Sequence, residues 1–202
     1  FIAKLDGAMQ KLEVGDPLLL ATDIGPLIDR GALEIMRAHT SRMEREATLQ
    51  GAAPLGKGTE HGFYFSPRAF EISSLSQLEG EIFGPILHIV RFKSDRLDAV
   101  VDAINNTGYG LTLGIQSRID STIQRIAGRA RVGNIYVNRN MIGAVVGVQP
   151  FGGEGLSGTG PKAGGPRYLH RFAVERTVTV NTAAAGGNPE LLSLADDAPA
   201  ID

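Results

Sequence analysis

Apolar residues recur at the spacing of an amphipathic helix in four stretches of the chain. The first covers residues 1–12 and ends before Gly15-Asp16-Pro17. The second is predicted from Asp29 to about Ala47, and two more are predicted at 95–105 and 120–130. The positions that we expect to face the core in these helices are Phe1, Leu5, Met9, Leu12, Leu33, Met36, Met43, Ala47, Leu97, Val100, Val101, Ile104, Ile123, Ile126, Ala127 and Ala130.

Short apolar runs between these helices predict β-strands. Residues 86–92, 111–117 and 134–138 have the length and content of buried strands, and a shorter strand is predicted near 62–66. Strands that alternate with helices of about 11 residues through short turns are typical of parallel strands joined by right-handed crossovers. Their apolar runs fit a sheet that is covered on both sides. The pattern therefore predicts an α/β fold with an open, mostly parallel sheet and helices on both faces.

The regular pattern stops after Asn138. Residues 139–167 are glycine-rich, and nine of the 26 glycines of the chain lie between Gly143 and Gly165. A connection of that length inside a domain is usually either functional or disordered. It contains the spacing Gly153-x-Gly155-x-x-Gly158, but the preceding strand ends fifteen residues earlier. A dinucleotide fingerprint leaves its strand directly, so we do not assign a Rossmann phosphate loop here.

Composition limits the class of protein. The 202 residues have room for one core or one core plus a tail, and 20 basic against 22 acidic residues give a net charge of -2. No basic patch indicates a nucleic-acid partner. No apolar stretch reaches the roughly 20 residues of a transmembrane helix, and no leader precedes the first helix. We therefore expect a cytoplasmic protein that acts on a small molecule. Because Phe1 already lies inside a helical pattern, we expect a cut through a longer protein.

Cysteine is absent, which removes disulfides, thiolate metal sites and a cysteine nucleophile from this chain. The four histidines share no ligand spacing, so no metal site is expected. His88 lies in the middle of a predicted strand, and we interpret it as a packed or edge residue.

The segment Glu81-Ile82-Phe83-Gly84-Pro85 directly precedes the strand predicted at 86–92. If this segment is extended, Glu81 and Phe83 point to the same side. Loops at strand ends of open α/β sheets bind ligands, although this loop enters its strand. The residues alone leave two interpretations open: a ligand contact, or a capped turn with a packed Phe83.

Several segments, in their order along the chain, resemble the aldehyde dehydrogenase superfamily over about residues 1–182. The segments that carry this resemblance are Gly15-Asp16-Pro17, Asp23-Ile24-Gly25-Pro26, residues 81–85, 106–111, 132–138 and 150–153. Residues 147–153 and 156–166 are similar to the glutamate semialdehyde (1-pyrroline-5-carboxylate) dehydrogenase branch. The likeness is greatest to the dehydrogenase half of bifunctional proline utilization A flavoproteins, in which a proline dehydrogenase domain precedes this one. FAD would belong only to that absent upstream domain.

The resemblance implies cofactor contacts for Glu81 and Phe83. Glu81 would accept hydrogen bonds from the ribose hydroxyls beside the nicotinamide of NAD, because each carboxylate oxygen can take an O–H donor. Phe83 would pack against the same ribose. The residues that discriminate NAD from NADP lie upstream in the family, so NADP is not excluded.

The resemblance also implies substrate contacts in the glycine-rich loop. Gly164 and Gly165 would present backbone N–H groups to the α-carboxylate of the substrate, since successive N–H groups form a small anion nest. Phe151 and Phe172 would pack against the aliphatic part of the substrate. A simple core position is the alternative for Phe172.

In this family a cysteine attacks the aldehyde, hydride passes to NAD, and water hydrolyses the thioester. That cysteine lies shortly before the helix with which this chain begins, and no residue here replaces a thiolate. The resemblance therefore implies part of an NAD-dependent dehydrogenase that oxidises glutamate semialdehyde to glutamate in proline catabolism. The chain would supply no catalytic residue, and alone we expect it to be inactive. The alternative is a non-catalytic lid or assembly domain of the same fold.

Three parts are expected along the chain. Residues 1–170 would form a partial aldehyde dehydrogenase catalytic domain, 171–182 an oligomerisation strand, and 183–202 a C-terminal tail. The strand is predicted because residues 176–181 alternate around Val178 and Val180. In the superfamily such a strand pairs with a hairpin of a neighbouring subunit or domain, and unpaired edges invite partners. This implies a homo-oligomer for the full-length protein.

Overall fold

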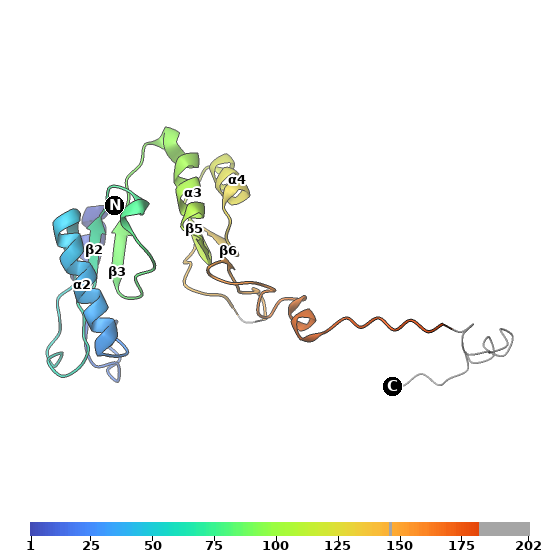
Figure 1. Ribbon diagram of the computed structural model, residues 1–202. Helices are drawn as coiled ribbons and strands as arrows, with labels where there is room; N and C mark the ends of the chain where they lie inside the picture. The colour runs from blue at the N-terminus through green and yellow to red at the C-terminus, as the bar shows by residue number, and fades with distance from the viewer. Residues whose placement is uncertain (146, 182–202) are drawn as a thin grey trace.

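The computed structural model describes residues 1–145 and 147–181, and its elements fall into two groups along the chain (Figure 1). The first group contains α1 (Ile2–Met9), α2 (Arg30–Glu46), β1 (Thr48–Ala52), β2 (Arg68–Glu71), the 3-10 helix η1 (Leu75–Gln77) and β3 (Ile86–Ile89). The second contains η2 (Ser94–Arg96), α3 (Leu97–Asn106), β4 (Tyr109–Gly110), β5 (Thr112–Ile115), α4 (Asp120–Arg129), β6 (Asn134–Val137), β7 (Glu154–Gly155) and η3 (Tyr168–Phe172). All four predicted helices are present, close to their expected bounds.

Helix α2 begins and ends where its sequence predicts. The Asp29 carboxylate accepts a hydrogen bond from the Ala32 N–H at 2.7 Å and so caps the first turn. The predicted inner positions Leu33, Met36 and Met43 are buried, with Met43 fully excluded from solvent. Met43 packs with Phe70 of β2, so the helix covers one face of the first sheet.

Within residues 1–145 and 147–181 the strands form three small sheets, so the one open sheet that was predicted is not present in this part of the chain. β1 is antiparallel to β2, β2 is parallel to β3, β4 is antiparallel to β7, and β5 is parallel to β6. The crossover β5–α4–β6 is the parallel unit that was predicted, and the mixed α/β class is confirmed. β3 pairs with β2 instead of β5, and β1 lies on the far side of β2.

Those two strands were missed for a physical reason. β2 places only Ala69 and Phe70 between two charged residues, which is too short a run for a visible alternation. The predicted strand near 62–66 is absent from the structure. Phe65 in that segment is buried in the core beside Leu33 instead, so its apolar character reflects packing and not strand pairing.

The first sheet has a helix on each face. In β2, successive side chains point to opposite faces, and Phe70 faces α2. The neighbouring Ala69 pairs with Gly51 of β1, and a side chain added at Gly51 would meet Asp6 and Met9 of α1. Helix α1 therefore covers the face opposite α2.

Two bidentate ion pairs join α3 to α4. The Arg125 Nε and Nη2 atoms each donate to an Asp98 carboxylate oxygen at 2.7 Å. Arg129 holds Asp102 in the same way, at 2.7 and 2.5 Å. The hydrogen bonds from the two arginines lower the pKa of both carboxyl groups. These pairs are exposed and contribute little stability each, but together they align the two helices.

Residues 173–181 extend away from the second group (Figure 1) and, within the described part of the chain, belong to no β-ladder. Val178 and Val180 are 75% and 71% exposed. The oligomerisation strand stays a prediction, and its last residue and the expected tail at 183–202 lie outside the described residues. Among the described residues, no helix combines the length and the apolar content of a membrane span.

Candidate cofactor and substrate site

The loop between η1 and β3 carries Glu81 and Phe83 on its outer side. Ile82 between them packs against the core cluster that contains Met36. Gly84 lies so close to Met36 that an added Cβ would overlap the Met36 sulfur. Glu81 is exposed, and Phe83 is 84% exposed. The expected alternation is therefore present, and the interpretation with a packed Phe83 is wrong.

Glu81 lines a cavity of about 710 Å³. Its walls come from the η1 loop on one side and from the end of α3, β4 and the glycine-rich loop on the other. The residues that line it are Ser74, Leu75, Ser76, Leu78, Glu79, Gly80, Glu81, Ala103, Asn106, Thr107, Tyr109 and Leu156. Glu81 and Leu156 of the glycine-rich loop thus line the same cavity. Of the six predicted site residues, Glu81 alone lines it.

The glycine-rich loop folds back onto the start of β6. The Asn134 side chain donates to the Pro150 carbonyl at 3.0 Å and accepts from the Gly152 N–H at 3.3 Å. The Lys162 ammonium donates to the Gly133 carbonyl. Side-chain contacts to a strand thus fix a segment that has little regular structure of its own. Asn134 and Lys162 were missed as loop contacts, since no local spacing links them to their partners.

Gly164 and Gly165 lie in a tight turn. Gly164 has a φ of 70°, a conformation that favours glycine, and the Gly165 N–H donates to the Lys162 carbonyl at 3.1 Å. A substrate carboxylate would therefore compete with the Lys162 carbonyl for the Gly165 N–H. The role of the two amides in substrate binding stays a prediction.

Of the two predicted phenylalanines, Phe151 lies beside this turn and Phe172 lies in the 3-10 helix that follows it. Phe151 exchanges two backbone hydrogen bonds with Ala163, at 3.0 and 2.9 Å, and so lies directly beside the turn. Phe172 lies in η3, where its ring meets Tyr168 edge to face at 5.5 Å between centroids. Phe172 is 71% exposed, so its alternative interpretation as a core residue is wrong.

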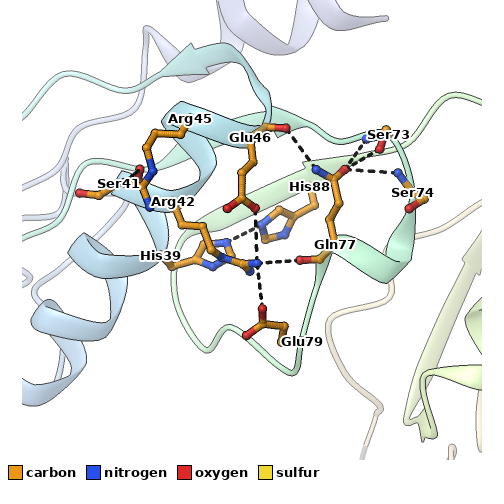
Figure 2. A network of polar contacts seen from close by, with 10 residues as sticks. All are labelled: His39, Ser41, Arg42, Arg45, Glu46, Ser73, Ser74, Gln77, Glu79 and His88. Atoms are coloured by element: carbon orange, nitrogen blue, oxygen red, sulfur yellow. Dashed lines mark hydrogen bonds and ion pairs between the residues drawn. The ribbon is translucent and has the colours of Figure 1, made fainter.

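His39 of α2 and His88 of β3 are in contact (Figure 2). Their Nε2 atoms lie 2.8 Å apart, so one ring donates and the other accepts. Burial lowers the pKa of both rings, and His39 and Arg42 lower the pKa of His88 further, to about 4. The interpretation of His88 as a packed residue is confirmed, but its pairing was missed. The available signal was the position of His39 on the apolar stripe of α2.

The histidine pair predicts a loss of stability in mild acid. Because both rings have a lower pKa in the folded chain, the unfolded chain binds more protons between about pH 4 and 6.5. The stability that the neutral histidine pair contributes to the folded chain is therefore complete above about pH 6.5 and is lost as the pH falls through about 4. Since His88 is only half-buried, we expect a contribution of about 1–2 kcal/mol. Urea unfolding at pH 7 and pH 5 measures it.

The matched variants for this measurement are His88→Gln and His61→Gln. His61 is exposed, and His61→Gln is the control for the replacement of a histidine outside the pair. His88→Gln should reduce the difference between pH 7 and pH 5. An equal difference in both variants would show that the pair does not couple folding to pH.

The chain belongs to the aldehyde dehydrogenase family, whose profile matches residues 1–178. Among curated relatives, the bifunctional protein PutA of Klebsiella aerogenes is 49% identical over 180 residues, covering 87% of this chain and 14% of that protein. Among solved structures, a variant of proline utilization A (PutA) from Bradyrhizobium japonicum is 57% identical with a TM-score of 0.82, covering 92% of this chain and 19% of that one. The 1-pyrroline-5-carboxylate dehydrogenase from Thermus with bound NAD is 32% identical with a TM-score of 0.75, covering 85% and 33%.

These matches confirm the predicted family and its likeness to PutA and to 1-pyrroline-5-carboxylate dehydrogenases. The chain spans 14% of the Klebsiella protein and 33% of the Thermus chain. It therefore corresponds to one part of an aldehyde dehydrogenase region.

Proposed function

We propose that the chain is part of an NAD-dependent dehydrogenase that oxidises L-glutamate γ-semialdehyde to glutamate. In that enzyme it supplies contacts to the cofactor ribose and to the substrate carboxylate. The observation that carries the proposal is the exposed pair Glu81 and Phe83 on a loop that the core holds at Ile82. Likeness to a 1-pyrroline-5-carboxylate dehydrogenase with bound NAD supports the choice of cofactor and substrate.

The residues present fit the ribose of a nicotinamide dinucleotide. Glu81 is exposed and lines a cavity, so its two carboxylate oxygens are open to a pair of neighbouring hydroxyl groups. The exposed ring of Phe83 offers an apolar surface beside it. When bound, NAD would supply the acceptor for the hydride that leaves the substrate carbon. The part of Glu81 and Phe83 is to fix the ribose, and with it the ring that receives the hydride.

On the substrate side, Gly164 leaves the backbone open to a close approach, while the Gly165 N–H is shared with the Lys162 carbonyl. A Cβ at Gly164 would meet no atom within 4 Å, so space for a ligand exists at this position. Phe151 lies beside the turn and offers the apolar wall that a short aliphatic chain needs. The chain contains no cysteine. We propose that the nucleophile comes from outside these 202 residues, and that the isolated chain forms no NADH.

A chimera tests the proposal. In it, residues 1–181 of this chain replace the matching segment of the Klebsiella PutA protein, which retains its own remaining residues. We expect this chimera to form NADH from NAD and glutamate semialdehyde, while the 202-residue chain alone forms none.

Either of two results would contradict the proposal. One is NADH formation by the chain alone above the blank. The other is a chimera that folds and assembles but forms no NADH, which would favour the non-catalytic lid or assembly domain.

A further inference from the structure

Helix α2 contacts the segment around Glu81 at two points. Ile82 packs on the core cluster that includes Met36, and Arg42 binds the segment at Gln77. The Arg42 Nη1 atom donates to the Gln77 backbone carbonyl at 3.0 Å and lies 3.4 Å from a Glu79 carboxylate oxygen (Figure 2). The Arg42 side chain is 24% exposed, whereas that of Glu79 is 86% exposed. The stronger of the two contacts is therefore the one to the carbonyl, since solvent weakens an exposed ion pair.

The Gln77 side chain also stabilises this 3-10 turn, through hydrogen bonds to the backbone on both sides of it. Its carbonyl oxygen accepts from the Ser73 N–H at 2.6 Å, and its amide group donates to the Glu46 backbone carbonyl at 3.1 Å. Figure 2 shows Gln77 between α2 and the Ser73–Ser74 backbone. The 3-10 turn is thus tied to the last turn of α2 through two residues, Arg42 and Glu46.

Glu81 lies in the short span between these two points of attachment. Residues 78–81 connect Gln77, which Arg42 holds, to Ile82, which packs in the core. The span includes Gly80, whose missing side chain leaves open space and permits many backbone conformations. With both ends fixed, the backbone that carries Glu81 has less freedom, and release of one end would increase it.

We propose that Arg42 is a positioning residue for the cofactor: it fixes Gln77 and so limits where the Glu81 carboxylate lies. This role rests on the proposed function, because Glu81 must be the ribose contact for Arg42 to affect NAD. Both contacts come from the Arg42 Nη1 atom, whose two N–H groups can serve the carbonyl and the carboxylate together.

The test uses Arg42→Gln, Arg42→Lys and the control Arg45→Lys. Arg45 lies on the same helix, and its Nη1 atom donates to the Ser41 carbonyl one turn back, at 2.7 Å. The first measurement is amide hydrogen exchange in the full 202-residue chain, at the Gln77 and Leu78 amides that close the 3-10 turn. We expect exchange there to be about tenfold faster in Arg42→Gln, because the turn opens locally more often. Arg42→Lys should recover part of the protection, and Arg45→Lys should match the unmodified chain.

The second measurement is NAD binding by the chimera, followed by calorimetry and so independent of turnover. We expect Arg42→Gln to raise the Kd for NAD about 3–10-fold while kcat at saturating NAD stays within about twofold, since the contact orders the site before chemistry. Unchanged exchange at Gln77 and Leu78 would overturn the role of Arg42. Faster exchange with an unchanged Kd would overturn its link to the cofactor. An unmodified chimera that binds no NAD would instead overturn the proposed function, and the exchange result would still show whether Arg42 holds the loop.

Discussion

Replacing Gly133 with alanine is expected to lower the free energy of unfolding by about 3 kcal/mol, because a new methyl group here overlaps the backbone of the glycine-rich loop and displaces it. A Cβ at Gly133 would overlap the Gly152 carbonyl and crowd Gly153. At the same residue the N–H donates to the Gly110 carbonyl at 2.9 Å, and the carbonyl accepts from Lys162. The strand cannot move away without losing these bonds, so the glycine-rich loop must move instead. Urea unfolding of the purified chain measures the change.

Gly128→Ala is the matched control for this substitution. Gly128 lies inside α4, and a Cβ there would meet nothing within 4 Å. Alanine is the better helix former, so this variant should raise the unfolding free energy by about 0.5–1 kcal/mol. Two alanine variants of the same chemistry should thus change stability in opposite directions. Equal effects would show that the loop does not pack on Gly133 as described.

Replacing Glu81 with glutamine in the chimera is expected to weaken NAD binding about tenfold, because a neutral amide oxygen is a poorer acceptor than a carboxylate. Glu81→Ala should weaken it further, since both acceptor oxygens are then lost. Calorimetric titration with NAD measures both variants. The fold should be unaffected, because Glu81 is exposed and only its neighbour Ile82 reaches the core.

The control for this second prediction is Glu60→Gln, which removes one negative charge from another exposed loop position. Its Kd for NAD should equal that of the unmodified chimera. If Glu60→Gln and Glu81→Gln weaken binding equally, the effect is one of overall charge, and the ribose contact is contradicted.

The helices of this protein could be predicted because each carries its own signals. α2 shows an N-terminal Asp29 cap and a stripe of apolar residues, and both features act within a few residues of each other. The unit β5–α4–β6 was predicted for the same reason, since short turns join its parts. Local sequence therefore determined these elements.

The sheets could not be predicted to the same extent, because pairing depends on contacts between distant segments. β2 has two apolar residues in a four-residue strand, and its partners β1 and β3 lie in separate parts of the sequence. The site shows the same division. The outward placement of Glu81 and Phe83 follows from alternation along one loop. The hold of Arg42 on Gln77, 35 residues away, has no local pattern that would indicate it.

The paired aspartates and arginines on α3 and α4 have a further consequence for how this region assembles. Asp98 and Asp102 are one turn apart on α3, as are Arg125 and Arg129 on α4. Asp98 pairs with Arg125, and Asp102 pairs with Arg129. If α4 slid by one turn, about 5.4 Å, a single crossed pair would form and one aspartate and one arginine would lose their partners. The four charges therefore favour the observed alignment of the two parallel helices over one shifted by a turn. Apolar contacts between helices discriminate less between these two alignments.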